Sequence, residues 1–117
     1  MEFDWNAGEL AAGLKCYKQQ KYFEAHEHWE TLWRQAEGVE KTLLQALIQL
    51  SVAFCHRQRG NHRGAVSMLK KSLDRIALCP DSCGDINVAR LRAEALAWLE
   101  FFARGEMGNP PAVPAIR

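Results

Sequence analysis

The sequence predicts an all-α fold of about five helices, arranged as antiparallel helical hairpins in a weakly tetratricopeptide-like array. Apolar residues recur at helical spacing in five successive stretches of the chain. None of these stretches shows the sustained period-two alternation of β-branched residues that marks a strand, so no strand is expected. Only a few residues separate successive stretches, which favours helices that pack antiparallel to their neighbours in sequence.

A first helix is predicted over residues 7–20, where Leu10, Leu14 and Tyr17 recur at helical spacing. A second helix is predicted over residues 23–36. Its apolar stripe consists of Ala25, Trp29, Leu32, Trp33 and Ala36. A stripe of this kind is expected to face the core, with the charged residues between its members turned towards solvent.

The third helix, over residues 39–59, is apolar almost all the way round, which predicts that it is the most buried element. Gly38 is expected to end the second helix before it. A fourth helix follows Gly60, with Asn61 as its N-cap, and stops before Pro80, which cannot continue a helix.

A loop over residues 81–87 offers Asp85 and Asn87 as caps for a fifth helix, which Gly105 ends. The predicted organisation is one helical domain over residues 1–105, followed by an extended, proline-rich tail over residues 106–117. Such a tail is either a loose end or a strap across the surface.

Bulk properties exclude several classes of protein. The 117 residues suffice for one core, and a balance of 15 Lys and Arg against 14 Asp and Glu makes a nucleic-acid binder unlikely on charge. No signal sequence and no run long enough to cross a bilayer is expected. Four cysteines without a framework spacing favour an intracellular, reducing, cytoplasmic location.

Four motifs resemble the domain of unknown function 309 family. They are Phe23-Glu-Ala-His-Glu-His-Trp-Glu, Leu-Trp-Arg34, Leu44-Gln-Ala-Leu-Ile-Gln49 and Gly60-Asn61 followed by Gly64-Ala65. Ala46 stands where the family is expected to have glycine. The resemblance covers roughly residues 10–102 and implies an all-helical intracellular protein without an established activity.

Two rows of polar residues lie along otherwise apolar helices, and these rows define the candidate site. His26, Glu30 and Arg34 follow one another at helical spacing, Glu27 flanks them, and His28 is expected to face solvent. On the third helix the second row comprises Gln45, Gln49 and His56. Because buried polar groups need partners, we expect the two rows to face each other.

Two functions remain open for this site. It would bind a small polar ligand or a divalent metal, with His26, Glu30 and His56 as nitrogen and oxygen ligands. Alternatively, these residues form a structural buried network within a non-catalytic protein-interaction module, whose grooves or basic turn contact a partner. No motif in the sequence specifies a reaction, and self-association is an open expectation.

Two further clusters of reactive or charged side chains are present in the sequence. Arg57, Arg59 and Arg63 crowd the turn before the fourth helix, together with His62, and would bind an anion there or simply form a solvated face. Cys79 and Cys83 form a Cys-x-x-x-Cys pair, for which two ordinary loop cysteines are a simpler interpretation than a redox or metal site.

Overall fold

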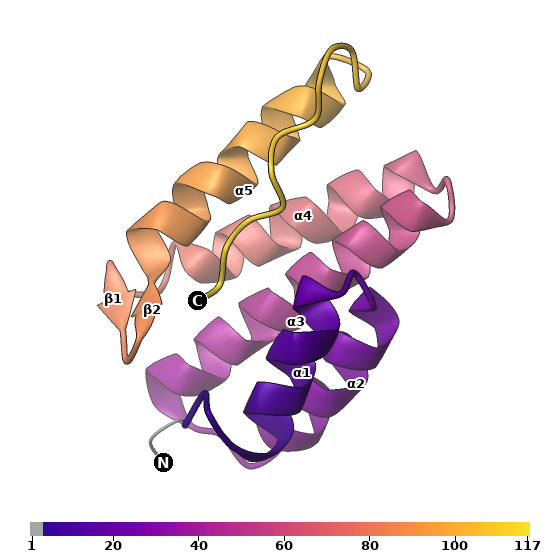
Figure 1. Cartoon of the computed structure of the whole chain (residues 1–117). Coiled ribbons are helices and arrows are strands. Elements are labelled where there is room, and N and C mark those ends of the chain that lie inside the picture. Colours follow the sequence, from indigo (N-terminus) through magenta and orange to yellow (C-terminus); the bar gives the residue numbers. More distant parts are fainter. Residues whose placement is uncertain (1–3) are drawn as a thin grey trace.

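Five helices follow one another in this computed structural model, which describes residues 4–117 (Figure 1). They are α1 (Gly8–Lys18), α2 (Tyr22–Trp33), α3 (Gly38–Gln58), α4 (His62–Ile76) and α5 (Val88–Ala103). The main helix contacts join neighbours in sequence, so that α1 packs on α2, α2 on α3, α3 on α4 and α4 on α5. The all-α fold class is therefore confirmed.

The helix ends follow the expected caps at two places. Asn61 Oδ1 accepts a hydrogen bond from the Gly64 amide at 2.9 Å, at the start of α4. Asn87 Oδ1 does the same for the Arg90 amide at 3.0 Å, at the start of α5. Each side chain satisfies an amide that has no partner within the first turn of its helix.

The prediction for Gly38 was wrong, because this residue begins α3 and does not end α2. Helix α2 ends at Trp33, and the Ala36 amide then closes on the Leu32 carbonyl at 3.0 Å. Gly38 adopts a φ of +62°, a left-handed backbone that glycine enters without steric cost. The chain therefore reverses over residues 34–37, three residues earlier than the spacing of apolar residues indicated.

The expected loop over residues 81–87 contains a short hairpin, so the prediction of no strand was also wrong. Strand β1 (Ser82–Cys83) pairs antiparallel with β2 (Ile86–Asn87). Gly84, with φ +58°, occupies the first central position of the two-residue turn, where tight hairpins favour glycine. Strands of two residues are too short to produce a visible alternation in the sequence.

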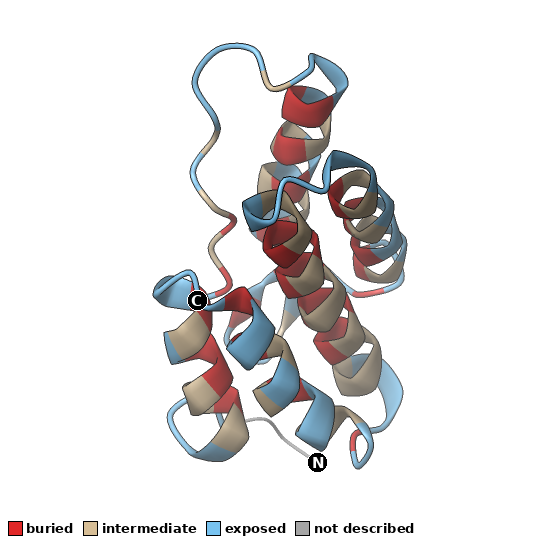
Figure 2. Cartoon of the chain, turned by 90° about the vertical axis from the view of Figure 1, so that its right-hand side faces the viewer, coloured by how far each residue is buried: buried red, intermediate tan, exposed pale blue. Residues whose placement is uncertain are grey.

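Helix α3 carries more buried residues than any other helix of residues 4–117, as predicted (Figure 2). Its buried positions are Leu43, Leu44, Ala46, Leu47, Leu50, Ser51, Ala53, Phe54 and Cys55. None of the helices in this part of the chain is long and apolar enough to cross a membrane. Helix α3 therefore lies in the middle of the array, with α2 and α4 as its main neighbours.

A row of aromatic rings links α1, α2, α3 and α5 through this core. Tyr17 lies 5.5 Å from Tyr22, Tyr22 lies 5.3 Å from Phe54, and Phe54 lies 5.0 Å from Trp98, all measured between ring centroids. The Phe54–Trp98 pair is edge-to-face, at an interplanar angle of 84°. Such pairs stabilise a fold beyond the area they bury, by about 0.5–1.5 kcal/mol each.

Helix α1 approaches α2 most closely at Gly13, which lies against the Trp29 ring. A Cβ atom at Gly13 would lie 2.6 Å from Cδ1 and 2.7 Å from Cε2 of this indole, and closer still to Nε1. Trp29 is fully buried, so its ring has no room to move away. Glycine at this position is therefore required by the packing of the two helices.

We expect Gly13→Ala to lower the free energy of unfolding by about 1–3 kcal/mol, because overpacking forces the ring or the helix to shift. A loss of stability would be informative, because replacing glycine by alanine within a helix normally raises stability, by up to about 1 kcal/mol. Urea unfolding of the variant against the wild type measures the difference. A higher midpoint for Gly13→Ala would contradict the close contact.

Residues 106–117 run back along the molecule in an extended conformation, between α1 and α5 (Figure 1). The Trp98 indole N–H donates to the Ala112 carbonyl at 2.9 Å, and the Ala115 amide donates to Glu94 at 3.0 Å. Later tail residues thus meet earlier residues of α5, so the segment is antiparallel to that helix. The tail is therefore held as a strap over residues 112–117.

Candidate functional site

The first polar row lies on the outer side of α2. His26 Nε2 is 2.9 Å from Glu30 Oε2, and their side chains are 22% and 48% exposed. His26 Nδ1 lies 3.3 Å from the Phe23 carbonyl, one turn earlier in the helix. Both partners of His26 therefore belong to α2 itself, and the row is a local feature of one helix surface.

His56, at the end of the second polar row, turns away from the first row, so the expected contact between His56 and the row on α2 was wrong. No hydrogen bond or ion pair joins the two rows within residues 4–117. Helix α2 meets α3 through Tyr22 against Phe54 at one end and Trp33 against Lys41 at the other. His56 lies two residues beyond Phe54, about 200° around the helix, and therefore faces α4.

The neighbour of His56 confirms its direction. His56 Nδ1 lies 3.2 Å from the side-chain amide of Asn61, at the N-terminus of α4. Gln45 is partly buried, and Gln49 buries its side-chain oxygen without a hydrogen-bond partner in the described chain. Within residues 4–117 no side-chain hydrogen bond joins Gln45, Gln49 or His56 to the polar row on α2.

The predicted metal set of His26, Glu30 and His56 is therefore not assembled. Within residues 4–117 no group of three or more histidine, cysteine, aspartate or glutamate side chains is placed to hold a metal ion. The physical reason is the helical phase of His56, which turns its ring to the opposite side of α3. His26 and Glu30 alone form an exposed pair on one helix, and a pair supplies too few ligands for a divalent ion.

A shallow hollow of about 350 Å³ does gather part of the predicted site on the exposed side of α2. Its lining residues are Glu27, Glu30, Thr31, Arg34 and Gln35. Three of these were predicted from the polar row, and sequence reasoning missed Thr31 and Gln35. Thr31 lies four positions after Glu27, on the same helix face, and Gln35 lies four positions after Thr31, just beyond the end of α2.

The three arginines of the basic turn do not converge on a common anion site. Arg57 pairs with Glu106 at 2.7 Å and lies 4.9 Å above the Trp98 ring. Arg59 lies 5.8 Å above the Phe23 ring, whereas Arg63 is exposed on the outer side of α4. The guanidinium of Arg57 is already neutralised by a carboxylate, and the other two point to different helices.

His28 is not simply solvent-facing, since its Nδ1 lies 2.6 Å from Glu9 Oε2 and its side chain is 36% exposed. This pair links α2 to the start of α1. Such a partly exposed ion pair contributes about 0–1 kcal/mol to stability. Its position favours a structural role for His28 between the two helices.

All four cysteines are free thiols. Burial raises the pKa of the Cys79 thiol, and the neighbouring Cys83 raises it further. Burial also raises the pKa of Cys83, with Glu40 adding to the effect. Because the thiolate is the reactive form, these shifts make both residues weaker nucleophiles and metal ligands at neutral pH.

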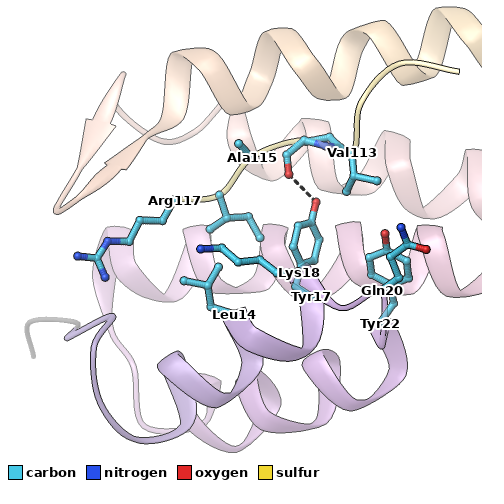
Figure 3. Close-up of a pocket in the computed structure, with 10 residues that line it drawn as sticks. Leu14, Tyr17, Lys18, Gln20, Tyr22, Val113, Ala115 and Arg117 are labelled. Carbon is cyan, nitrogen blue, oxygen red and sulfur yellow. Dashed lines mark hydrogen bonds between the residues drawn. The ribbon is translucent and has the colours of Figure 1, made fainter.

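A second cavity, missed in the sequence, lies between α1 and the tail (Figure 3). It has a volume of about 240 Å³. Its lining residues are Leu14, Tyr17, Lys18, Gln20, Tyr22 and the last five residues of the tail, 113–117. The two sides are nearly the whole chain apart in sequence, and only the proline-rich composition of residues 109–117 signalled that this segment is extended.

Tyr17 connects the two sides of this cavity. Its hydroxyl donates to the Pro114 carbonyl at 2.7 Å, and the residue is buried (Figure 3). Burial raises the pKa of the phenol well above its usual value of about 10, and the nearby Tyr22 and Glu94 raise it further. The protonated phenol is the form that donates to the tail, so the shift and the hydrogen bond act in the same direction.

We expect stability to fall as the pH rises above about 10, the pKa of an unfolded tyrosine. In that window the folded chain keeps the Tyr17 proton and the unfolded chain has lost it, so deprotonation favours unfolding. Tyr17→Phe should cost about 0.5–1.5 kcal/mol at pH 7, from the lost hydrogen bond, and should then lose less stability at alkaline pH. Urea midpoints between pH 7 and 11.5 measure both effects.

Tyr22→Phe is the matched control for this titration. Burial also raises the pKa of Tyr22, but Arg57 lowers it in opposition, so this variant should flatten the alkaline profile less than Tyr17→Phe. Equal alkaline slopes for Tyr17→Phe and the wild type would show that the Tyr17 phenol does not carry the effect.

Comparison with known proteins supports the resemblance seen in the motifs. Residues 10–68 match the model of a family described as a domain of unknown function (DUF309). The chain is also similar to an uncharacterized protein of Aquifex aeolicus (strain VF5), with 28% identity over 111 residues, which are 94% of this chain. Those residues are 29% of the Aquifex protein, so the chain spans less than a third of that relative.

Proposed function

Since the chain belongs to the domain of unknown function 309 family, which is defined without an activity, we propose a function from the geometry of the site. The protein is a non-catalytic protein-interaction module that contacts its partner through the outer face of α2. This α2 face comprises Phe23, His26, Glu27, Glu30, Thr31, Arg34 and Gln35. The observation that carries the proposal is the open, mixed-charge hollow along this helix.

The shape of the hollow favours a protein partner over a small molecule. Sites for small ligands enclose most of the ligand surface, in clefts whose walls come from several elements. Here three lining residues lie on α2 and the other two, Arg34 and Gln35, in the turn directly after it, and all five are exposed to solvent. Arg34 and the two carboxylates instead offer both signs of charge to a surface that lies against them.

Phe23 supplies an apolar anchor beside these charges. Its side chain remains 47% exposed and packs against the His26 ring at 5.5 Å between centroids, and the Arg59 guanidinium lies 5.8 Å from the centre of the Phe23 ring. An exposed aromatic residue flanked by polar groups is the usual composition of an interface centre with its rim. The partner is expected to place basic groups opposite Glu27 and Glu30, and an acidic group opposite Arg34.

The small-ligand interpretation keeps one supporting observation, the pairing of two carboxylates with Arg34 around a hollow of about 350 Å³. A zwitterionic molecule would match these charges. The four free cysteines support a reducing, cytoplasmic location for either function.

The proposal is tested by photocrosslinking in cells, with a photoreactive amino acid at Thr31 within the hollow. Thr31 is exposed, so the substitution leaves the core unchanged. We expect a discrete crosslinked protein from Thr31, and none from the same probe at Ser67, an exposed position on the outer side of α4. A free-ligand site would give binding of a zwitterion in solution and no discrete protein adduct.

A charge swap then links the adduct to the proposed contact. Glu27→Lys with Arg34→Glu exchanges the signs while it keeps the net charge, and should reduce the crosslink yield at least tenfold, because like charges face each other across the interface. The matched control is Lys70→Glu with Asp74→Lys, a swap between two exposed residues of α4. Equal crosslink yields for the two swapped proteins would refute the α2 face as the contact surface.

A further inference from the structure

The tail lies in a groove whose walls are α1 and α5. Tyr17 stands on one wall and Trp98 on the other, and both donate hydrogen bonds to the tail. Phe54 of α3 lies between these walls, in contact with Trp98 and with Tyr22. We call this the tail groove, and it is a site separate from the α2 face.

The groove holds the tail mainly through its backbone. Trp98 and Tyr17 donate to the carbonyls of Ala112 and Pro114, and Glu94 accepts from the Ala115 amide. Hydrogen bonds to alternate carbonyls of an extended segment form with its backbone, so they do not depend on which side chains the segment carries. Aromatic residues that donate in this way line the grooves by which proteins recognise proline-rich peptides.

Two side chains of the tail anchor it. Pro114 is buried, and Ile116 is only 3% exposed. Pro111 and Pro114 are three positions apart, a spacing that places both on one edge of a polyproline II helix. The tail thus shows the features of a bound peptide ligand, with few backbone conformations to lose when it binds.

The tail does not fill its groove. The cavity of about 240 Å³ remains between α1 and Val113 to Arg117. This volume is smaller than the roughly 300–1,000 Å³ of typical small-molecule sites, but it can take a larger side chain on the bound segment. Lys18 lies at its edge and has no ion-pair or hydrogen-bond partner among residues 4–117.

We propose that the tail groove is a docking site for an extended, proline-containing segment of a partner protein, and that the tail of this chain is its intramolecular competitor. The partner segment carries a larger residue in the place of Val113, and it fills the cavity that the tail leaves empty. A second copy of this chain would carry the same Val113 and would leave the same cavity, so the occupant is a different protein.

The segment before the groove allows the tail to leave. Gly105, Glu106 and Gly108 all have positive φ values, of +69°, +59° and +88°. Glu106 holds this conformation without being glycine, and its carboxylate lies 2.7 Å from Arg57 and 3.8 Å from His62. Rotation about these few residues releases the tail while α5 stays folded.

The test uses the full-length chain with its own tail weakened. Ile116→Asp removes the buried anchor of the tail and leaves the groove intact, and Ala112→Asp adds the same charge at an exposed tail position as a matched control. Fluorescence anisotropy follows a labelled peptide of residues 109–117. The Ile116→Asp protein should bind it at least tenfold more tightly than the wild type or Ala112→Asp, because the tail no longer competes.

Two further comparisons identify the groove and the occupant. Tyr17→Phe added to Ile116→Asp should weaken peptide binding about fivefold, from the loss of one hydrogen bond. A peptide with Val113→Leu should bind about fourfold more tightly than the native sequence, because one more CH₂ group is buried. If the leucine peptide binds no better, the cavity does not select a larger residue and the foreign partner is refuted.

A second version of the protein keeps the proposal testable if Ile116→Asp does not fold. A protease site inserted between Gly108 and Asn109 lets the tail be cut after folding, and the cut tail should then exchange for labelled peptide. Absence of both binding and exchange would refute the docking site. A wild-type dimer that Ile116→Asp dissociates would instead show that the groove accepts the tail of a second copy of the chain, and would refute a foreign partner.

Discussion

Trp29→Ala should lower the free energy of unfolding by about 3–5 kcal/mol, one of the two largest effects expected in this protein. Trp29 is fully buried, and it contacts Trp5 edge-to-face at 6.4 Å and Tyr17 at 6.0 Å between ring centroids. Its indole N–H also donates to the Leu10 carbonyl at 3.3 Å. Alanine would leave a cavity between α1 and α2, and urea unfolding measures the loss.

A double variant tests whether the contact between Gly13 and Trp29 is the cause. On the Trp29→Ala background the indole is gone, so Gly13→Ala should become neutral or stabilising by up to about 1 kcal/mol, the opposite sign from its effect in the wild type. Trp33→Ala is the control, because Trp33 is only partly buried and its ring is covered by Lys41 at 4.4 Å. If the two tryptophans cost the same, burial of Trp29 against α1 is not the cause.

Trp98→Ala should be equally costly, at about 3–5 kcal/mol, and should also release the tail. Trp98 is 2% exposed and packs edge-to-face on Phe54 and Phe101, and its N–H is the donor to Ala112. Removing the indole also takes away the ring below Arg57, which then lies against a cavity. Urea unfolding reports the stability, and trypsin reports the tail through cleavage after the exposed Arg104.

Trp98→Phe separates the two effects. Phenylalanine keeps most of the packing but has no N–H, so trypsin should remove the tail faster than in the wild type, while the loss of stability stays well below that of Trp98→Ala. A tail that is cleaved at the wild-type rate in Trp98→Ala would show that the Ala112 contact does not hold it.

The helices were predictable because their signals are local. Asn61 as a cap and the apolar stripes with period 3.6 each depend on residues within a few positions of one another. The β-hairpin was missed for the opposite reason, because four paired residues carry no periodicity. Gly38 was misassigned because a glycine after a helix and a glycine before one look alike in sequence when the turn is short.

The site was predicted only in part, since its geometry depends on how one helix is rotated against another. The row of His26, Glu30 and Arg34 lies on one helix, and sequence spacing alone placed these residues together. Whether His56 would join them depended on which side of α3 faces α2, and Phe54 occupies that side. The sequence pattern of a single helix predicts which residues share a face, but it does not predict which neighbouring helix packs against that face.

Most helix contacts in this fold join helices that follow one another, so the contacting residues lie close together in sequence. The tail is the exception. The hydrogen bond from Tyr17 to Pro114 spans 97 positions, and the one from Arg117 to Asn6 spans 111. Helical hairpins with local contacts form rapidly, whereas a contact that closes nearly the whole chain into a loop carries the largest entropic cost. We therefore expect the strap to dock last in folding and to open first, and it bridges α1 and α5, the first and last helices of the array.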